Sequence, residues 1–212
     1  MFLSLQGEGP SAGIPAHFLR LQGCDVGCSW CDTKYSWELS GGREMTPEQA
    51  WAAARALGES PLLVVTGGEP LLHPGLGAVL ESALGRWPRV EVETSGIAPP
   101  PLSRPGLFYN VSPKMPAATP RWAETWAHTA AWLAEPRATF KIVVADDADL
   151  DACAEWRRRH GVPAERVMLM PEGMTAETLR ARYVWLEERC VRDGLRMSPR
   201  LHVWLWGARR GV

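Results

Sequence analysis

Three cysteines within eight residues carry the strongest chemical signal in this 212-residue chain. Cys24, Cys28 and Cys31 form the segment CDVGCSWC, with the spacing CxxxCxxC, directly after an apolar run. Three thiolates on one loop can bind three irons of a cubane [4Fe-4S] cluster, which leaves the fourth iron open for chemistry. Because the chain has five cysteines, an odd number, a metal site fits them better than a disulfide framework.

A zinc site is the alternative that the cysteines alone leave open. A closed structural zinc site needs four ligands, and His17 or Asp32 would have to supply the fourth. A chance group of free thiols is a further alternative. Cys153 and Cys190 each stand alone in helix-like segments, where a cysteine is usually a small buried hydrophobic residue.

A second motif, GGEP at 67–70, follows a predicted strand. Taken alone it is typical of a plain turn from a strand into a helix. Together with CxxxCxxC and the aromatic Trp30 before the last cysteine, it is similar to the motif pair of the radical S-adenosylmethionine (SAM) superfamily. The resemblance implies that the open iron chelates SAM, that the GGEP backbone meets the SAM amino group, and that electron transfer generates a 5'-deoxyadenosyl radical.

Outside these motifs the chain resembles one subfamily almost from end to end, the 7-carboxy-7-deazaguanine synthases of queuosine and 7-deazapurine biosynthesis. The resemblance implies a carbon–nitrogen lyase. It contracts 6-carboxy-5,6,7,8-tetrahydropterin to 7-carboxy-7-deazaguanine with loss of ammonia, regenerates SAM and requires Mg²⁺. The matching segments are FLSLQGEG, CDT, TGGEP, ETSG, NVSPK, FKIVV, MPEG and SPRLHVWLWG.

The carboxylate of such a substrate calls for a guanidinium, whose paired donors fit it better than a lysine does. Arg20 matches that position, although without the resemblance it would be taken as a surface or ion-paired arginine. Thr33 matches the Mg²⁺ residue, where one hydroxyl plus substrate oxygens could serve a hard cation; the plain alternative is a turn cap. The substrate residues that the resemblance implies are Leu5, Gln6, Gly7, Glu8, Arg20, Thr66, His202 and the terminal carboxylate of Val212.

The resemblance also implies a set of SAM contacts. None of them is assigned as a nucleophile, acid or base, since the cofactor performs the difficult chemistry. Thr94 is expected close by. The set comprises Trp30, Cys31, Asp32, Gly68, Glu93, Ser95, Ser112, Pro113, Lys114, Met170, Pro171, Glu172 and Gly173.

Alternating strands and helices must position these residues. Short apolar, β-branched runs alternate with helical patterns, which indicates an α/β fold with a parallel sheet. Thr46 as N-cap, Pro47 and Gln49 mark the start of one helix, and Gly161 and Gly194 close two others. The predicted strands lie at 17–23, 61–68, 90–96, 107–114, 139–144, 166–173 and 201–207, and the predicted helices at 46–58, 74–86, 121–134, 147–160 and 175–193.

Ligands of such folds gather at the carboxyl ends of the strands, where TGGEP, ETSG, SPK and MPEG all fall. The resemblance implies a partial, modified (β/α)6 radical SAM barrel, and we expect a single domain over 1–212. A net charge of −1 gives no field that would gather nucleic acid or a membrane surface. With neither a signal peptide nor an apolar span in the sequence, we expect a cytoplasmic enzyme acting on a small molecule.

Two alternatives to the synthase remain at this level. A glycyl-radical-activating enzyme shares the cluster motif but gives no reason for QGEG, Arg20 or the RLH segment. A zinc-stabilised binding module without catalysis is the other. The resemblance further implies a homodimer and a one-electron donor such as a flavodoxin or a ferredoxin.

Overall fold

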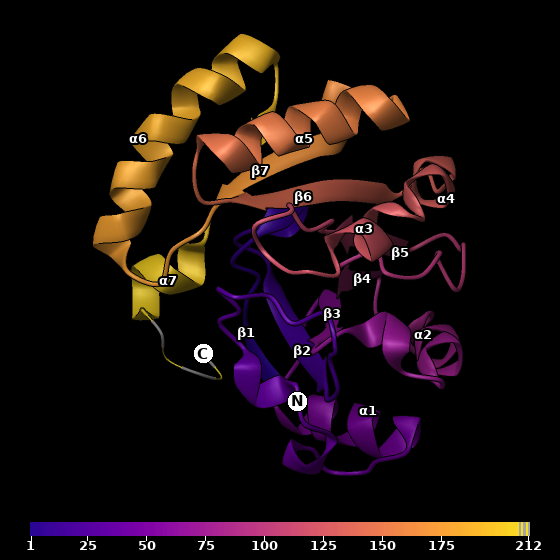
Figure 1. Ribbon diagram of the computed structural model, residues 1–212. Coiled ribbons are helices and arrows are strands. Elements are labelled where there is room, and N and C mark those ends of the chain that lie inside the picture. Colours follow the sequence, from indigo (N-terminus) through magenta and orange to yellow (C-terminus); the bar gives the residue numbers. More distant parts are fainter. Residues whose placement is uncertain (208, 210, 212) are drawn as a thin grey trace.

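The strands form one continuous sheet in the order in which they occur along the chain. The computed structural model describes residues 1–207, 209 and 211. β1 pairs antiparallel with β2, and each later strand pairs parallel with the one before it. β1 and β8 are the two edges, so the curved sheet stays open as a partial barrel (Figure 1). The strands are β1 (Phe2–Leu5), β2 (Pro15–Leu21), β3 (Leu62–Gly67), β4 (Arg89–Thr94), β5 (Leu107–Val111), β6 (Ala138–Val144), β7 (Val167–Pro171) and β8 (Arg196–Met197).

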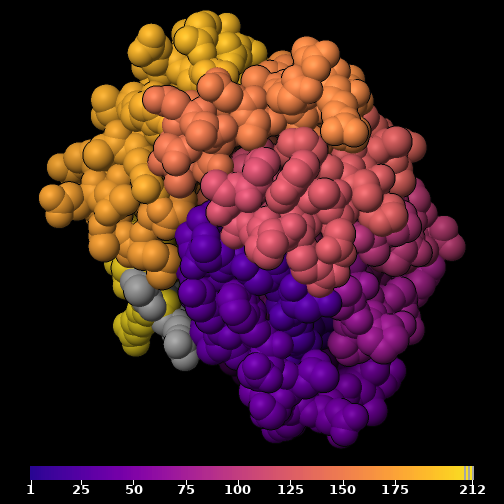
Figure 2. Space-filling view, in the orientation of Figure 1, coloured from indigo at the N-terminus to yellow at the C-terminus, as the bar shows by residue number. Residues whose placement is uncertain are grey.

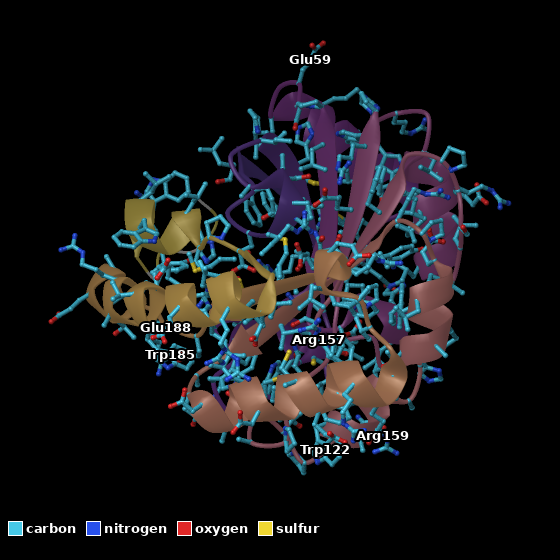
Figure 3. All side chains as sticks on the ribbon, turned by 90° about the horizontal axis from the view of Figure 1, so that it is seen from above. Glu59, Trp122, Arg157, Arg159, Trp185 and Glu188 are labelled. Atoms are coloured by element: carbon cyan, nitrogen blue, oxygen red, sulfur yellow. The ribbon has the colours of Figure 1, made fainter. Side chains whose placement is uncertain are left out.

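Helices cover the outside of the sheet and bury one core against it. Trp51, Trp132 and Trp156 are fully buried helix residues that pack with strand residues such as Val92 and Phe140. Charged side chains such as those of Glu59, Arg159 and Glu188 point outward (Figure 3). The α-helices are α1 (Pro47–Ala56), α2 (Leu76–Ala83), α3 (Trp122–Trp126), α4 (Thr129–Ala134), α5 (Asp147–His160), α6 (Ala176–Asp193) and α7 (Leu201–Trp206), and the short 3-10 helices are Gly9–Ser11, Lys34–Ser36, Leu39–Gly41, Pro70–Leu72 and Ala164–Arg166.

Most of the predicted elements are confirmed. The capping box at α1 is formed, since the Thr46 hydroxyl accepts from the Gln49 N–H and the Gln49 side chain accepts from the Thr46 N–H. Gly161 and Gly194 end α5 and α6 with φ of 65° and 64°, a left-handed conformation that glycine adopts without strain. The helix predicted at 121–134 is two helices, α3 and α4. Residues 95–106, all described, connect β4 to β5 without a helix, which is where the barrel pattern is modified.

The strand predicted at 201–207 is wrong, because this segment forms the helix α7. The run LHVWLWG is apolar at nearly every position, and such a short run does not distinguish a strand from a helix. The Leu201 N–H donates to the Gly7 carbonyl at 2.9 Å instead of to a neighbouring strand. Val203 is the buried residue of the helix, while Trp204 and Leu205 are exposed. The short edge strands β1 and β8 were not predicted.

The parallel register places predicted site residues beside polar residues of the neighbouring strands, near the carboxyl ends of the strands. Arg20 of β2 lies opposite Thr66 of β3, and Glu93 of β4 lies opposite Asn110 of β5. Figure 2 shows the amino-terminal segment between the carboxyl-terminal part and the middle of the chain, so segments distant in sequence meet on this face. Among the described helices, none has the length and apolar character needed to cross a bilayer.

Candidate active site

A cavity of about 310 Å³ opens at the carboxyl ends of the parallel strands. Its walls come from the loop after β1, the cysteine loop, the ends of β2 to β7, and α7. The structure therefore brings together most of the residues that the sequence predicts as a site. Predicted residues that line the cavity are Leu5, Gln6, Gly7, Glu8, Arg20, Cys24, Cys28, Trp30, Asp32, Thr33, Thr66, Gly68, Glu93, Ser95, Ser112, Lys114, Met170 and His202, together with Thr94.

Some predicted residues lie beside the cavity without lining it. Cys31 is half-buried on the cysteine loop, with its Sγ 3.7 Å from the Thr33 Oγ1. Pro113 follows β5, and the turn formed by Pro171, Glu172 and Gly173 ends β7. The predicted contact of Val212 lies outside the described residues.

The cysteine loop is held by backbone hydrogen bonds, and none of its three cysteines is in a disulfide. The Cys24 N–H donates to the Trp37 carbonyl at 3.2 Å, and the Cys31 N–H donates to the Cys28 carbonyl at 3.2 Å. Burial raises the pKa of the Cys24 and Cys28 thiols, which disfavours their charged thiolate forms. An iron bound in place of the proton would supply the positive charge that stabilises these thiolates. Three free cysteines on one loop at the mouth of a cavity therefore fit the ligand set of a cluster.

A single zinc ion, unlike a cluster, would need all of its ligands grouped around one point. Among residues 1–207, 209 and 211, no three His, Cys, Asp or Glu side chains are grouped to hold one ion. In a cubane cluster, each thiolate binds its own iron. Both candidates for a fourth zinc ligand are engaged elsewhere: the buried His17 accepts from the Trp87 indole at Nδ1, 3.0 Å away, and Asp32 is paired with Arg200.

The GGEP segment packs directly against the start of the cysteine loop. The Gly68 N–H donates to the Leu21 carbonyl at 3.0 Å, and the Glu69 N–H donates to the Gly23 carbonyl at 2.9 Å. A Cβ on Gly68 would lie 2.3 Å from the Gly23 carbonyl oxygen, so only glycine allows this approach. The segment thus presents backbone to the cavity beside Cys24.

The carboxylate of Glu69 joins the ends of β3 and β4, a role that the sequence did not reveal. It accepts from the Ser95 N–H at 2.7 Å and from the Thr94 hydroxyl at 2.5 Å. Ser95 is buried, and its hydroxyl has no partner among the described residues. That hydroxyl is therefore available to a ligand in the cavity.

The predicted SPK segment contacts the cysteine loop through its lysine. The Lys114 ammonium donates to the Ser112 hydroxyl at 3.0 Å and lies 5.5 Å from the centre of the Trp30 ring. A cation over an aromatic face is an attractive contact. The end of β5 is thereby joined to the segment between Cys28 and Cys31.

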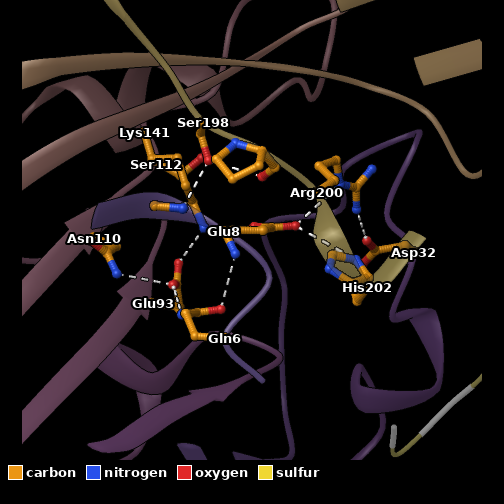
Figure 4. A network of polar contacts seen from close by, with 12 residues as sticks. Gln6, Glu8, Asp32, Glu93, Asn110, Ser112, Lys141, Ser198, Arg200 and His202 are labelled. Atoms are coloured by element: carbon orange, nitrogen blue, oxygen red, sulfur yellow. Dashed lines mark hydrogen bonds and ion pairs between the residues drawn. The ribbon is translucent and has the colours of Figure 1, made fainter. Parts of the chain in front are cut away.

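A buried lysine on the neighbouring strand β6 lies between two carboxylates (Figure 4). The Lys141 ammonium, on β6, is 2.7 Å from the Glu8 Oε2 and 2.6 Å from the Glu93 Oε2. Burial would lower the pKa of Lys141, but the two carboxylates outweigh it and raise that pKa. The lysine is therefore charged, and it holds the loop after β1 against the sheet.

The two carboxylates of this network differ in their surroundings. Burial opposes the charged form of Glu8, but Lys141, Arg200 and His202 together hold its pKa well below the usual range. Burial raises the pKa of Glu93 despite Lys141. Glu93 Oε1 also accepts from the side-chain amides of Gln6, at 3.1 Å, and Asn110, at 3.0 Å. Glu93 is thus the carboxylate of the pair that protonates more easily.

Lys141, Arg200 and Asn110 are site residues whose roles the sequence analysis missed. Lys141, Arg200 and Asn110 occur inside the motifs FKIVV, SPRLHVWLWG and NVSPK, but no role was predicted for them. The available signal was a charged or amide side chain inside an apolar run, since such residues are buried only when paired. Arg20, by contrast, was predicted, and its guanidinium lies 5.8 Å from the centre of the Tyr35 ring and donates to the Gly67 carbonyl at 3.4 Å.

Comparisons with known proteins agree with this geometry. Residues 19–108 match the model of the radical SAM superfamily. The chain is 42% identical to a 7-carboxy-7-deazaguanine synthase of Pyrobaculum aerophilum, covering 100% of this chain and 95% of the relative. It is 36% identical to the synthase of Hyperthermus butylicus, covering 96% and 89% of the two chains.

Solved structures give the same result for the fold. The crystal structure of QueE from Escherichia coli superposes with a TM-score of 0.66 at 28% identity, covering 93% of this chain and 90% of that one. The Streptococcus suis protein SuiB, bound to SAM, shares the fold alone, with a TM-score of 0.57 at 10% identity over 86% of this chain and 49% of that chain. The partial, modified radical SAM barrel is therefore confirmed.

The full-length match to named synthases favours that family over a glycyl-radical-activating enzyme or a zinc-stabilised module. A radical SAM enzyme carries a [4Fe-4S] cluster, binds SAM, acts on a small molecule in this subfamily and takes electrons from a donor. With the cysteine loop, the GGEP turn and full-length relatives in agreement, the chain belongs to the 7-carboxy-7-deazaguanine synthase family of radical SAM enzymes.

Proposed function

We propose that this protein converts 6-carboxy-5,6,7,8-tetrahydropterin to 7-carboxy-7-deazaguanine with release of ammonia. The observation that carries this proposal is one cavity that contains a guanidinium with no carboxylate partner among the described residues, two partly buried carboxylates and two of the three clustered cysteines. The cluster and SAM, when bound, supply a radical that abstracts hydrogen from the substrate. The chain's own residues have to bind the pterin, orient it and exclude water.

Arg20 is the residue proposed to bind the substrate carboxylate. Lys141 and Arg200 are both neutralised by carboxylates within 3.1 Å. Within the described part of the chain, by contrast, no carboxylate lies within 4 Å of the Arg20 guanidinium, which meets only the Gly67 carbonyl and the Tyr35 ring. An unpaired guanidinium that lines a cavity is suited to a two-pronged contact with a carboxylate.

Glu8, Glu93 and Gln6 are proposed to bind the amide and amidine edge of the pterin. That edge presents N–H donors beside a carbonyl, which carboxylate and amide side chains match. Lys141 and Asn110 both contact the Glu93 carboxylate, so its oxygens are oriented before a ligand binds. A pterin bound through its carboxylate and through its amidine has a fixed orientation, which is what a reaction at one carbon requires.

Thr33 is proposed as the protein ligand of Mg²⁺. Its hydroxyl lies at the mouth of the cavity and donates to the Asp32 Oδ1 at 3.1 Å. Mg²⁺ keeps several waters, so one hydroxyl plus substrate oxygens can complete its shell. Thr33→Ala should weaken the response of turnover to Mg²⁺, whereas Thr33→Ser, which keeps the hydroxyl, should not. An unchanged response in Thr33→Ala would return Thr33 to the role of a turn residue.

Anaerobic turnover tests the proposed function. Reconstituted protein is incubated with the carboxytetrahydropterin, SAM, a reductant and Mg²⁺, and the deazaguanine product, ammonia and remaining SAM are quantified. We expect product and ammonia in equal amounts, with SAM recovered. Protein that cleaves SAM reductively but yields no deazaguanine would refute the assignment. Arg20→Ala should retain iron and sulfide but lose pterin binding, and normal pterin binding in that variant would reject the role of Arg20.

The partners of the enzyme remain predictions. A flavodoxin or a ferredoxin is the expected class of electron donor, to be tested by replacing the chemical reductant in the same assay. A homodimer is expected, and light scattering of the cluster-loaded protein would distinguish it from a monomer. Metal analysis of the same sample tests the zinc alternative, since about one zinc without iron or sulfide would favour it.

A further inference from the structure

Arg200 is a buried arginine that contacts three separate segments of the site (Figure 4). Its Nε is 3.1 Å from the Glu8 Oε1, one terminal nitrogen donates to the Gly173 carbonyl at 2.6 Å, and the other is 2.5 Å from the Asp32 Oδ2. We propose that Arg200 is a positioning residue that couples binding of the pterin to binding of SAM. The inference rests on the proposed function and deepens it.

The three contacts belong to three segments, of which one is predicted to bind the pterin and two are predicted to contact SAM. Glu8 lies in the loop predicted to bind the pterin, and Gly173 in the turn predicted to bind SAM. Asp32 directly follows Cys31 on the cysteine loop. All three guanidinium nitrogens are used, one for each segment. Because the guanidinium is planar and rigid, it fixes the angles between its acceptors, which a flexible lysine would not do.

The backbone of Arg200 is fixed to the pterin loop as well. The N–H of the next residue, Leu201, donates to the Gly7 carbonyl at 2.9 Å. A Cβ on Gly7 would lie 2.4 Å from the His202 Nδ1, so the loop and the start of α7 are in close contact. Movement of the pterin loop therefore moves Arg200 with it.

Coupling follows from this shared attachment. A ligand that orders the turn at Gly173 also fixes Arg200, and through it the Glu8 carboxylate. The second ligand then meets a site in which part of the ordering has already occurred, so its affinity increases. By thermodynamic linkage the effect is reciprocal, and each ligand raises the affinity of the other by the same factor.

The other residues of the network do not replace Arg200 in this role. Lys141 joins Glu8 to Glu93, which ties the pterin loop to the sheet but reaches neither the cysteine loop nor the turn at Gly173. Arg182 contacts the turn through the carbonyl and carboxylate of Glu172. Within the described residues, Arg182 has no contact with Glu8 or Asp32, which makes it a matched control.

Equilibrium binding without reductant tests the proposal, because no turnover occurs. The Kd of SAM is measured on cluster-loaded protein with and without saturating carboxytetrahydropterin, and the Kd of the pterin with and without SAM. For the wild type we expect each ligand to tighten the other by the same factor, roughly tenfold. In Arg200→Lys the factor should fall to below about twofold. Arg182→Lys should keep the wild-type factor, whatever its effect on SAM affinity itself.

Iron and sulfide content verifies that each variant is loaded. If Arg200→Lys does not load, Asp32→Ala removes only one of the three contacts and should lower the factor in the same direction. Wild-type protein that binds the two ligands independently would overturn the proposal, as would an Arg200→Lys variant with an unchanged factor. Both results leave the proposed function intact, since wild-type turnover is measured separately. A wild-type protein that does not bind the pterin at all would instead refute the proposed function and the coupling together.

Discussion

Replacement of Lys141 by methionine tests whether the buried network is held by charge balance. The ammonium lies within 2.7 Å of both Glu8 and Glu93, and its side chain is 4% exposed. In Lys141→Met, Glu8 keeps Arg200 and His202, while Glu93 keeps only amide partners. The uncompensated charge is therefore that of Glu93.

The expected loss of stability is large. Removal of one partner of a buried ion pair costs about 3 to 5 kcal/mol. In a domain of this size each kcal/mol shifts Tm by about 2–4 °C, so a loss of about 3 kcal/mol lowers Tm by about 6–12 °C. Cluster-loaded wild type and variant are compared by anaerobic thermal unfolding at pH 8. Substrate binding should weaken in parallel, because Glu93 loses the group that orients it.

The loss of stability in Lys141→Met should be larger at high pH than at low pH. Burial already raises the pKa of Glu93, and without Lys141 it rises further above the unfolded value. Stability of the variant is then fully present below the unfolded pKa, near about 4.3, and is lost as pH rises through the folded pKa. The Tm deficit relative to wild type should therefore shrink as the pH falls from 8 to 5.

The double variant Lys141→Met, Glu93→Gln is the matched control. It removes the stranded charge and keeps an acceptor for the amides of Gln6 and Asn110, so it should recover more than half of the lost Tm and show little pH dependence. Double-mutant analysis suits this pair because the two side chains are in direct contact. A deficit that is constant between pH 5 and 8, or a double variant no more stable than Lys141→Met, would show that packing and not charge accounts for the effect.

Three further changes have outcomes that follow from single contacts. Cys28→Ala should abolish both cluster and turnover; retention of about four irons per chain would contradict the ligand assignment. Gly68→Ala places a Cβ 2.3 Å from the Gly23 carbonyl and should destabilise by about 1–3 kcal/mol, whereas Gly77→Ala, which meets nothing within 4 Å on α2, should be neutral or stabilising in the same melts. Thr46→Ala removes the cap of α1 and should cost about 1 kcal/mol of unfolding free energy, with turnover unchanged.

The helices and parallel strands could be predicted because local signals agreed with the fold. At α1 the capping residue, the proline and the glutamine all indicate the same helix start. In the segment 201–207 the local signals were not sufficient, since its apolar run has no distinct period. The start of its helix is held by a hydrogen bond to Gly7, which the sequence does not indicate. The break between α3 and α4 lies where distant segments make contact: the Trp126 indole donates to the Lys114 carbonyl at 2.9 Å, and the Trp156 indole donates to the Thr129 hydroxyl at 3.1 Å.

The candidate site residues likewise divide into those that a local motif indicates and those that only the fold brings together. The cluster ligands could be predicted because three cysteines at a characteristic spacing occur within one loop. Arg20 was predicted because it matches a position in a family motif. Lys141 could not be assigned from the sequence, because its partners lie 133 and 48 positions away and depend on the order of the strands. Glu93 was predicted as a SAM contact, and that prediction stands beside the partners that the fold gives it, Lys141, Gln6 and Asn110. Its role in pterin binding is therefore a proposal that arises from the structure.

The open edge of the sheet explains why so many charges are concentrated there. β1 and β8 do not pair with each other, so no ladder of backbone hydrogen bonds closes the barrel. The segments that follow these two strands meet instead, through the Gly9 N–H and the Ser198 hydroxyl at 2.8 Å and through Glu8 and Arg200, which are 192 positions apart. Polar side chains can hold two segments together and also contact a ligand, which a closed ladder cannot do. The same contacts therefore join the open edges and line the cavity, so Arg200 and His202 belong to the candidate active site as much as the cysteine loop does.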